Sequence, residues 1–149
     1  MAELEVDLVV VPIDGSDESR RAVEYAVTIA DSYGAAVHAL YVLGEPTVRA
    51  MDRGAVDEGD VADDTQAFGD IVAEIAAEAG VELSTSIAAG FSKSVKTLHP
   101  GSVVLDTAEQ LAADFVVVPR EPAADAESDV LEKAAEYVLL YASQPVVSV

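Results

Sequence analysis

The chain has 149 residues, of which 28 are Asp or Glu and 8 are Lys or Arg, and it contains no cysteine. A net charge of −20 makes nucleic acid and anionic membranes poor partners, because both are bound through cationic contacts. Without cysteine, disulfides and thiolate metal sites are excluded. No apolar run approaches the ~20 residues of a membrane helix, and the acidic N-terminus does not resemble a secretory signal. We therefore expect a single cytoplasmic domain over residues 1–149.

The acidic residues are spread along the whole chain rather than gathered in one tail. Such coats occur in proteins that work in concentrated salt, where the Debye length falls to roughly 3 Å at 1 M and self-repulsion is screened. This distribution favours a halophilic cytosol over a local interaction patch.

The first third of the chain predicts a strand, a helix and a second strand. Residues 7–13 form a nearly continuous apolar, β-branched run, which is typical of a strand covered on both faces. Ser16 can cap a helix whose first turn is acidic, and Gly34 ends the apolar periodicity of that helix. Residues 36–43 predict a second buried strand. Residues 44–60 are polar, contain proline and glycine, and predict a loop.

The middle of the chain continues the alternation. A helix with Phe68 on its apolar face ends at Gly80. Residues 81–88 alternate in polarity, which suits a half-exposed edge strand. His99 is expected to be a loop residue, and residues 100–102 (PGS) introduce the next helix.

Residues 114–119 (DFVVVP) nearly repeat residues 7–12 (DLVVVP) and predict a fourth strand. A last helix precedes a final short strand at residues 145–149. Alternating strands and helices predict an α/β fold with an open five-stranded parallel sheet and helices on both faces, a Rossmann-like architecture. With the edge-like strand outermost, right-handed crossovers favour the strand order 3-2-1-4-5. The two repeated strands then lie side by side, and a ligand crevice is expected at their carboxyl ends.

Two segments resemble the universal stress protein family. Residues 9–43 (VVVPIDGSDESRRAVEYAVTIADSYGAAVHALYVL) resemble its opening, which runs from an apolar strand through Pro-x-Asp-Gly-Ser to an alanine-rich helix and a second strand. The ending AAEYVLLYASQPVVSV resembles its closing helix and strand. The resemblance implies that Asp14 lies against a nucleoside, that the backbone of Val42 meets the base, and that Pro12 belongs to the same site. From the residues alone, Asp14 instead makes a turn that braces Ser16, and Val42 is sheet core.

The segments that follow the first and the fourth strands form the two walls of this crevice, and the second wall departs from the family pattern. Nucleotide-binding members carry Gly-x2-Gly-x9-Gly-Ser/Thr after the fourth strand, and its glycines let backbone amides approach phosphate. Counting back from Pro145 places these positions at Pro119, Pro122, Glu132 and Lys133, so all four motif residues are lost. The prolines remove donors and the carboxylates add negative charge. We therefore expect a degenerate nucleotide site with no cofactor, and ATP or AMP binding is disfavoured.

Other candidate sites are weaker. His38 lies on an apolar strand and is expected to be packed, and neither histidine has a partner at metal-ligand spacing, so no metal site is predicted. The acidic run at 57–64 does not fit calcium-loop spacing and is interpreted as solvated surface. Residues 89–99 hold Lys93 and Lys96 and are interpreted as a charge-protected edge segment, with an anion-attracting rim as the alternative. No nucleophile–base–acid arrangement is visible, so an enzyme is not expected.

Three functions remain. The leading hypothesis is a cytoplasmic stress-response protein acting as a dimeric binding or regulatory module. The alternative is an adenine nucleotide or nucleoside binder that uses only the first wall, and a nucleotide hydrolase is least favoured. A homodimer is expected through Val146, Val147 and Val149, because an unpaired apolar edge is normally paired or covered. The family resemblance implies the same interface.

Overall fold

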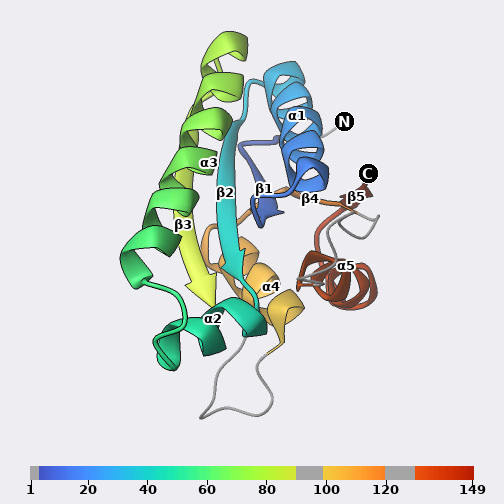
Figure 1. Ribbon diagram of the computed structural model, residues 1–149. Helices are drawn as coiled ribbons and strands as arrows, with labels where there is room; N and C mark the ends of the chain where they lie inside the picture. Colours follow the sequence, from blue (N-terminus) through green and yellow to red (C-terminus); the bar gives the residue numbers. More distant parts are fainter. Residues whose placement is uncertain (1–3, 90–98, 120–129) are drawn as a thin grey trace.

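The computed structural model describes residues 4–89, 99–119 and 130–149. Its strands form one sheet in the order β3-β2-β1-β4-β5, and every neighbouring pair is parallel, as the sequence predicts (Figure 1). The strands are β1 Leu8–Ile13, β2 Ala36–Leu43, β3 Leu83–Ala89, β4 Phe115–Val118 and β5 Val146–Ser148.

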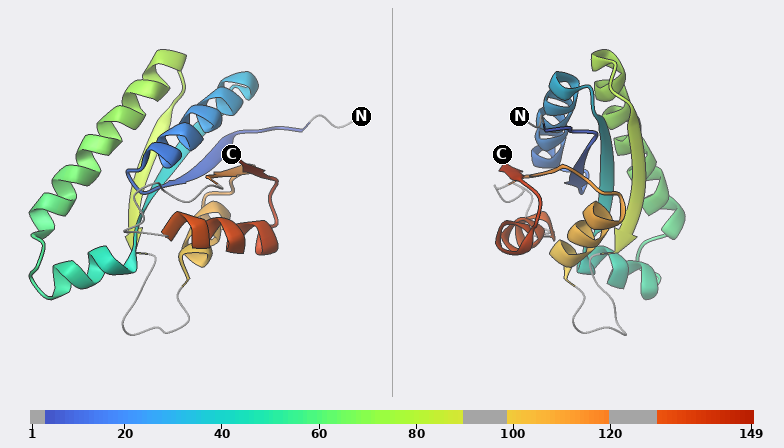
Figure 2. Two further views of the ribbon diagram at one scale, coloured as in Figure 1. Left: turned by 45° about the vertical axis from the view of Figure 1, so that its right-hand side comes forward. Right: turned by 180° about the vertical axis from the view of Figure 1, so that it is seen from behind.

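Helices cover both faces of this sheet. They are α1 Asp17–Tyr33, α2 Glu45–Asp52, α3 Glu58–Ala79, α4 Pro100–Gln110 and α5 Val130–Tyr141. The helices α1 and α3 pack on one face and α4 and α5 on the other, while α2 lies at the carboxyl end of β2 (Figure 2). Alternate residues of β1 enter opposite layers, since Val9 and Val11 belong to the core under α1 and Val10 to the core under α4 and α5. A strand buried on both faces needs the continuous apolar run that the sequence shows.

The two similar segments, DLVVVP and DFVVVP, form the adjacent strands β1 and β4, and an aspartate connects the starts of these strands. Strand β1 pairs with β4 in a register that places Val10 opposite Val116. One oxygen of Asp114, Oδ2, accepts hydrogen bonds from the backbone N–H groups of Asp7 at 2.8 Å and Leu8 at 3.1 Å. Asp114, which directly precedes β4, therefore holds the backbone at the start of β1.

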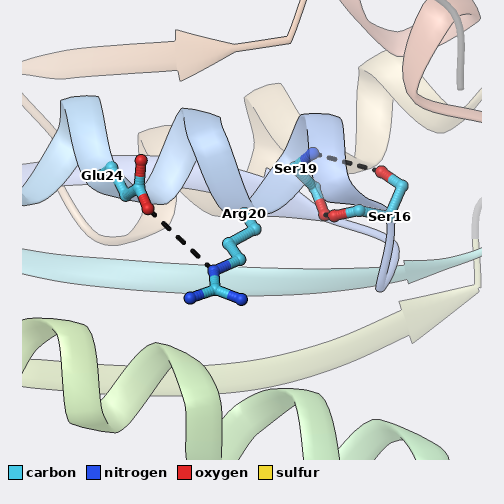
Figure 3. A network of polar contacts seen from close by, with 4 residues as sticks. All are labelled: Ser16, Ser19, Arg20 and Glu24. Atoms are coloured by element: carbon cyan, nitrogen blue, oxygen red, sulfur yellow. Dashed lines mark hydrogen bonds and ion pairs between the residues drawn. The ribbon is translucent and has the colours of Figure 1, made fainter.

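Helix α1 begins and ends where its capping residues predict. The Ser16 side chain accepts from the N–H of Ser19 at 3.1 Å (Figure 3). At the other end, Gly34 adopts a left-handed conformation with φ of 68°. Figure 3 also shows the exposed pair of Arg20 and Glu24 at 4.0 Å, a contact of the kind that adds little stability.

The prediction of a loop over residues 44–60 is wrong, because this stretch contains α2 and the start of α3. Pro46 lies in the first turn of α2, where its missing N–H leaves no intrahelical bond unmade. Arg49 and Glu45 form an ion pair one turn apart. Gly54, with φ of 71°, follows the helix in a left-handed conformation. Proline and glycine here delimit a short helix instead of marking a loop.

The two histidines have structural roles. His38 is packed as predicted, with 7% of its surface exposed, and its ring nitrogens hydrogen bond with Ser84 at 2.7 Å and Ser86 at 2.8 Å. His99 is more than the loop residue expected, because it is the N-cap of α4. Its Nδ1 accepts from the N–H of Gly101 at 3.0 Å, which satisfies one of the free donors at the helix start.

The edge of the sheet beyond β2 is formed by β3. Strand β3 is an outer strand with an alternating half-exposed pattern, as predicted, whereas most of the segment 89–99 lies outside the described residues.

Among the helices that the structure describes, none combines the length and apolarity needed to cross a membrane. The same ranges contain no group of three His, Cys, Asp or Glu side chains suited to a metal ion.

Candidate functional site

A hollow of about 440 Å³ opens at the carboxyl ends of the first two strands. Its lining comes from the turn after β1, the end of β2, and the helices α2 and α3. The lining residues are Asp14, Tyr41, Val42, Leu43, Gly44, Pro46, Thr47, Ala50, Val56, Val61, Asp64 and Thr65. This is the edge of the sheet at which ligands of open α/β folds bind.

Asp14 builds the turn between β1 and α1 and also faces the hollow. Its Oδ1 accepts from the backbone N–H of Ser16 at 3.0 Å and from the Ser16 hydroxyl. The interpretation of Asp14 as a brace for Ser16 is therefore confirmed by the contacts. Within the described ranges nothing donates to its other carboxylate oxygen, and the side chain is half-buried at the wall of the hollow.

Tyr41 ties the end of β2 to this turn. Its hydroxyl donates to the backbone carbonyl of Asp14 at 3.0 Å. Burial raises the pKa of Tyr41, the carboxylates of Asp14 and Asp64 raise it further, and a hydrogen bond with Thr65 lowers it in part. Gly15 is required beside this ring, because its φ is +87° and an added Cβ would lie 2.7 Å from the Tyr41 hydroxyl.

The three ligand-binding residues predicted from the sequence do not all meet. Val42 is 1% exposed, belongs to the core layer under α4 and α5, and also lines the hollow. Pro12 is buried within β1 opposite Leu40 and is not part of the lining. The structure thus brings Asp14 and Val42 to one hollow and leaves Pro12 as a strand residue behind it.

Sequence reasoning missed the contribution of Tyr41 and of α3. Asp64 and Thr65 precede Phe68 by four and three residues, so all three lie on neighbouring parts of the same helix surface. The ring of Phe68 meets Tyr41 edge-on at 6.2 Å. The helical spacing from the apolar Phe68 was the available signal that Asp64 and Thr65 point toward the sheet.

The charge of the hollow is negative on two sides. Asp14 and Asp64 enter from different elements, and no Lys, Arg or His of the described ranges lines it. On the second wall, Pro119 is buried at the end of β4, Glu132 is half-buried and Lys133 is exposed on α5. Pro122 and the rest of residues 120–129 lie outside the described residues.

The residues predicted for a dimer lie at the other edge of the sheet. Strand β5 is the outermost strand beside β4. Val146 packs on one core layer, and Val147 and Val149 on the other. The N–H of Val149 bonds to Val118 at 2.9 Å and the carbonyl of Pro145 accepts from Val116 at 3.0 Å. Because backbone groups alternate in direction along a strand, those of Val146 and Ser148 point to the open edge.

Comparison with known proteins identifies relatives over nearly the whole chain. The universal stress protein family model matches residues 5–149. A universal stress protein of Methanocaldococcus jannaschii is 29% identical over 144 residues, which cover 95% of this chain and 80% of the relative.

Solved structures share the fold. A universal stress protein in complex with cAMP has a TM-score of 0.68 at 20% identity, with 98% of both chains covered. The universal stress protein from Archaeoglobus fulgidus in complex with dAMP has a TM-score of 0.64 at 19% identity, also with 98% of both chains covered. At such identities the likeness establishes a common architecture.

Proposed function

The chain belongs to the universal stress protein family, and we propose that it is a cytoplasmic, non-catalytic binding and regulatory module that works as a homodimer. In this proposal its nucleotide site is degenerate. The first wall still accepts a nucleoside-sized ligand, whereas the second wall no longer holds a triphosphate.

One observation carries the proposal, which is the acidic lining of the hollow at Asp14 and Asp64 without a basic side chain from the described ranges. Phosphate groups are bound through backbone N–H groups and cations. Two carboxylates repel them, and Pro119 offers no N–H where the family motif has its first glycine. The chemistry of both walls therefore acts against polyphosphates.

Adenine nucleoside binding is a second candidate function, and a specific feature favours it. Asp14 and Val42 both line a hollow of about 440 Å³, which lies within the range of roughly 300–1,000 Å³ typical of small-molecule sites. Two structural relatives were solved with cAMP and dAMP. A neutral nucleoside meets no charge repulsion from Asp64, so we expect affinity to fall in the order adenosine, AMP, ATP.

Equilibrium binding of the three ligands in molar KCl tests both functions. Asp64→Asn should raise the affinity for AMP and ATP relative to adenosine, because it removes a repelling charge and keeps the side-chain shape. Asp63→Asn is the matched control, since Asp63 is the exposed preceding residue on α3 and does not line the hollow. Tight, magnesium-dependent ATP binding by the unmodified chain would contradict a degenerate site.

Two further measurements address the second wall and catalysis. Replacing Pro119, Pro122 and Glu132 by glycine together with Lys133→Ser should increase ATP affinity if those positions form the lost phosphate cradle. Sustained release of phosphate from ATP by the unmodified chain would refute the non-catalytic assignment.

A further inference from the structure

A second hollow, of about 250 Å³, lies between α4 and α5 on the opposite face of the sheet from α1 and α3. Its lining includes two carboxylates from α4, Asp106 and Glu109, and two aromatic rings from α5, Tyr137 and Tyr141. The proposed nucleoside function uses none of these residues. We propose that this hollow binds a small organic cation of the alkylammonium class.

The aromatic side of the hollow is firmly positioned. His99 stacks on Tyr137 with ring centroids 4.7 Å apart, and Tyr137 lies 4.6 Å from Tyr141. At Gly101 an added Cβ would lie 2.3 Å from the Cβ of Tyr137, so glycine is what allows α4 to approach α5 this closely. Tyr141 is 66% exposed, which leaves part of its ring accessible to a ligand.

The charged side of the hollow is negative, with no opposing cation among its described lining residues. Asp106 and Glu109 are three residues apart on α4 and share one helix surface. No Lys, Arg or His of the described ranges lines the hollow, and the last turns of α4 and α5 contain no basic residue. The negative end of the α5 dipole, where Tyr141 lies, therefore adds to the carboxylate charge, whereas the lining on α4 extends back to Ser102 in its first turn.

Carboxylates beside aromatic faces select for a particular kind of cation. Ring faces attract alkylammonium ions through their quadrupole, and such ions surrender water more readily than inorganic cations. The described ranges offer no set of three carboxylate or imidazole ligands that would favour a metal. The volume lies below the roughly 300 Å³ at which pockets for drug-sized ligands begin, so the ligand should be small.

The binding test uses tetramethylammonium chloride as the probe. It replaces KCl at constant ionic strength, and the tyrosine rings are followed by NMR, which is tractable because the chain has 5 tyrosines. We expect saturable shifts at Tyr137 and Tyr141, with Tyr25 and Tyr33 on α1 unchanged. The neutral isostere tert-butanol should not reproduce them.

Variants separate the contributions of ring and charge. Tyr141→Ala should weaken binding about two- to fivefold, whereas Tyr141→Phe keeps the ring face and should bind as before. The double variant Asp106→Asn with Glu109→Gln should weaken binding about tenfold. The double variant Glu74→Gln with Glu78→Gln, two exposed changes on the distant α3, is the matched charge control and should have no effect.

Three results would overturn the proposal. Shifts that do not saturate would remove the site, and equal shifts with tert-butanol would remove the role of charge. An equal loss of affinity in the double variant Glu74→Gln with Glu78→Gln would attribute the effect to the general acidic coat. Because Tyr141 is exposed and Tyr141→Phe preserves its ring, unfolding of one variant would not leave the question open.

Discussion

Replacing Gly101 by alanine should force α4 away from α5. The new Cβ would lie 2.3 Å from the Cβ of Tyr137 and 2.6 Å from its Cγ. Rotation about χ1 can move the Cγ of Tyr137 away, but it cannot move the Cβ, because the backbone fixes the position of that atom. Overpacking of this kind costs about 1–3 kcal/mol, and we expect the upper end here. Alanine returns up to about 1 kcal/mol through its better helix propensity, which leaves a net loss of about 2 kcal/mol.

Thermal unfolding followed by circular dichroism in molar KCl measures this loss. For a chain of this length a change of 1 kcal/mol shifts Tm by about 2–4 °C, so Gly101→Ala should lower Tm by about 4–8 °C. Gly69→Ala is the matched control, because Gly69 is also helical but nothing lies within 4 Å of its added Cβ. Adding Tyr137→Ala to Gly101→Ala should not restore Tm, since the clashing Cβ remains. A Tm for Gly101→Ala equal to that of Gly69→Ala would refute the reasoning.

Three other predictions concern salt, pH and assembly. The net charge of −20 should make Tm climb between low and molar KCl, and a Tm indifferent to salt would mean that the acidic coat does not oppose folding. Burial lowers the pKa of His38 below its usual value of about 6.5, so the stability it contributes is complete above about pH 6.5 and is lost as the pH falls through its folded-state pKa. The difference in Tm between wild type and His38→Gln should therefore shrink on acidification from about pH 7 to 5, and a constant difference would contradict it. For assembly, Ser148→Pro removes an N–H that points to the open edge, so light scattering in molar KCl should report a monomer for this variant and a dimer for Ser148→Ala. A dimer that survives both Ser148→Pro and Val147→Lys would exclude the β5 interface.

The sheet was predictable because its signals are local or periodic. The continuous apolar run of β1 follows from burial on both faces, and the half-exposed alternation of β3 identifies an outer strand. Ser16 and Gly34 fix the ends of α1 through capping geometry that depends on adjacent residues alone. Chain order and crossover handedness then leave few arrangements for the remaining strands.

The sequence did not predict the helix α2, because proline and glycine each occur in two structural contexts. Both occur in loops, but proline also begins helices and glycine also ends them. Pro46 in the first turn and Gly54 just beyond the end of α2 follow the second usage. A prediction based on the content of proline and glycine alone gives a loop. Their order along the chain, with proline first and glycine last, instead indicates a helix.

The site was predicted only in part because its residues converge from distant segments. Asp14 was identifiable from its turn, but its neighbour Asp64 reaches the same hollow from α3, and this depends on how that helix is rotated on the sheet. The stack of His99 on Tyr137 depends on the packing of α4 against α5. No local pattern reports such a contact, since it exists only after the two helices have docked.

The two interpretations of Asp14, as a turn residue and as a ligand-binding residue, are compatible with the same arrangement of this side chain. Its Oδ1 is committed to Ser16, which in turn caps α1, so the carboxylate is held in place by the fold itself. Tyr41 closes the other side of the turn through the Asp14 carbonyl, and the remaining carboxylate oxygen is left at the wall of the hollow. A side chain whose position is fixed by structural bonds loses little entropy when a ligand arrives. The turn chemistry that explains Asp-Gly-Ser without any ligand is therefore also what would preorganise Asp14 to bind one.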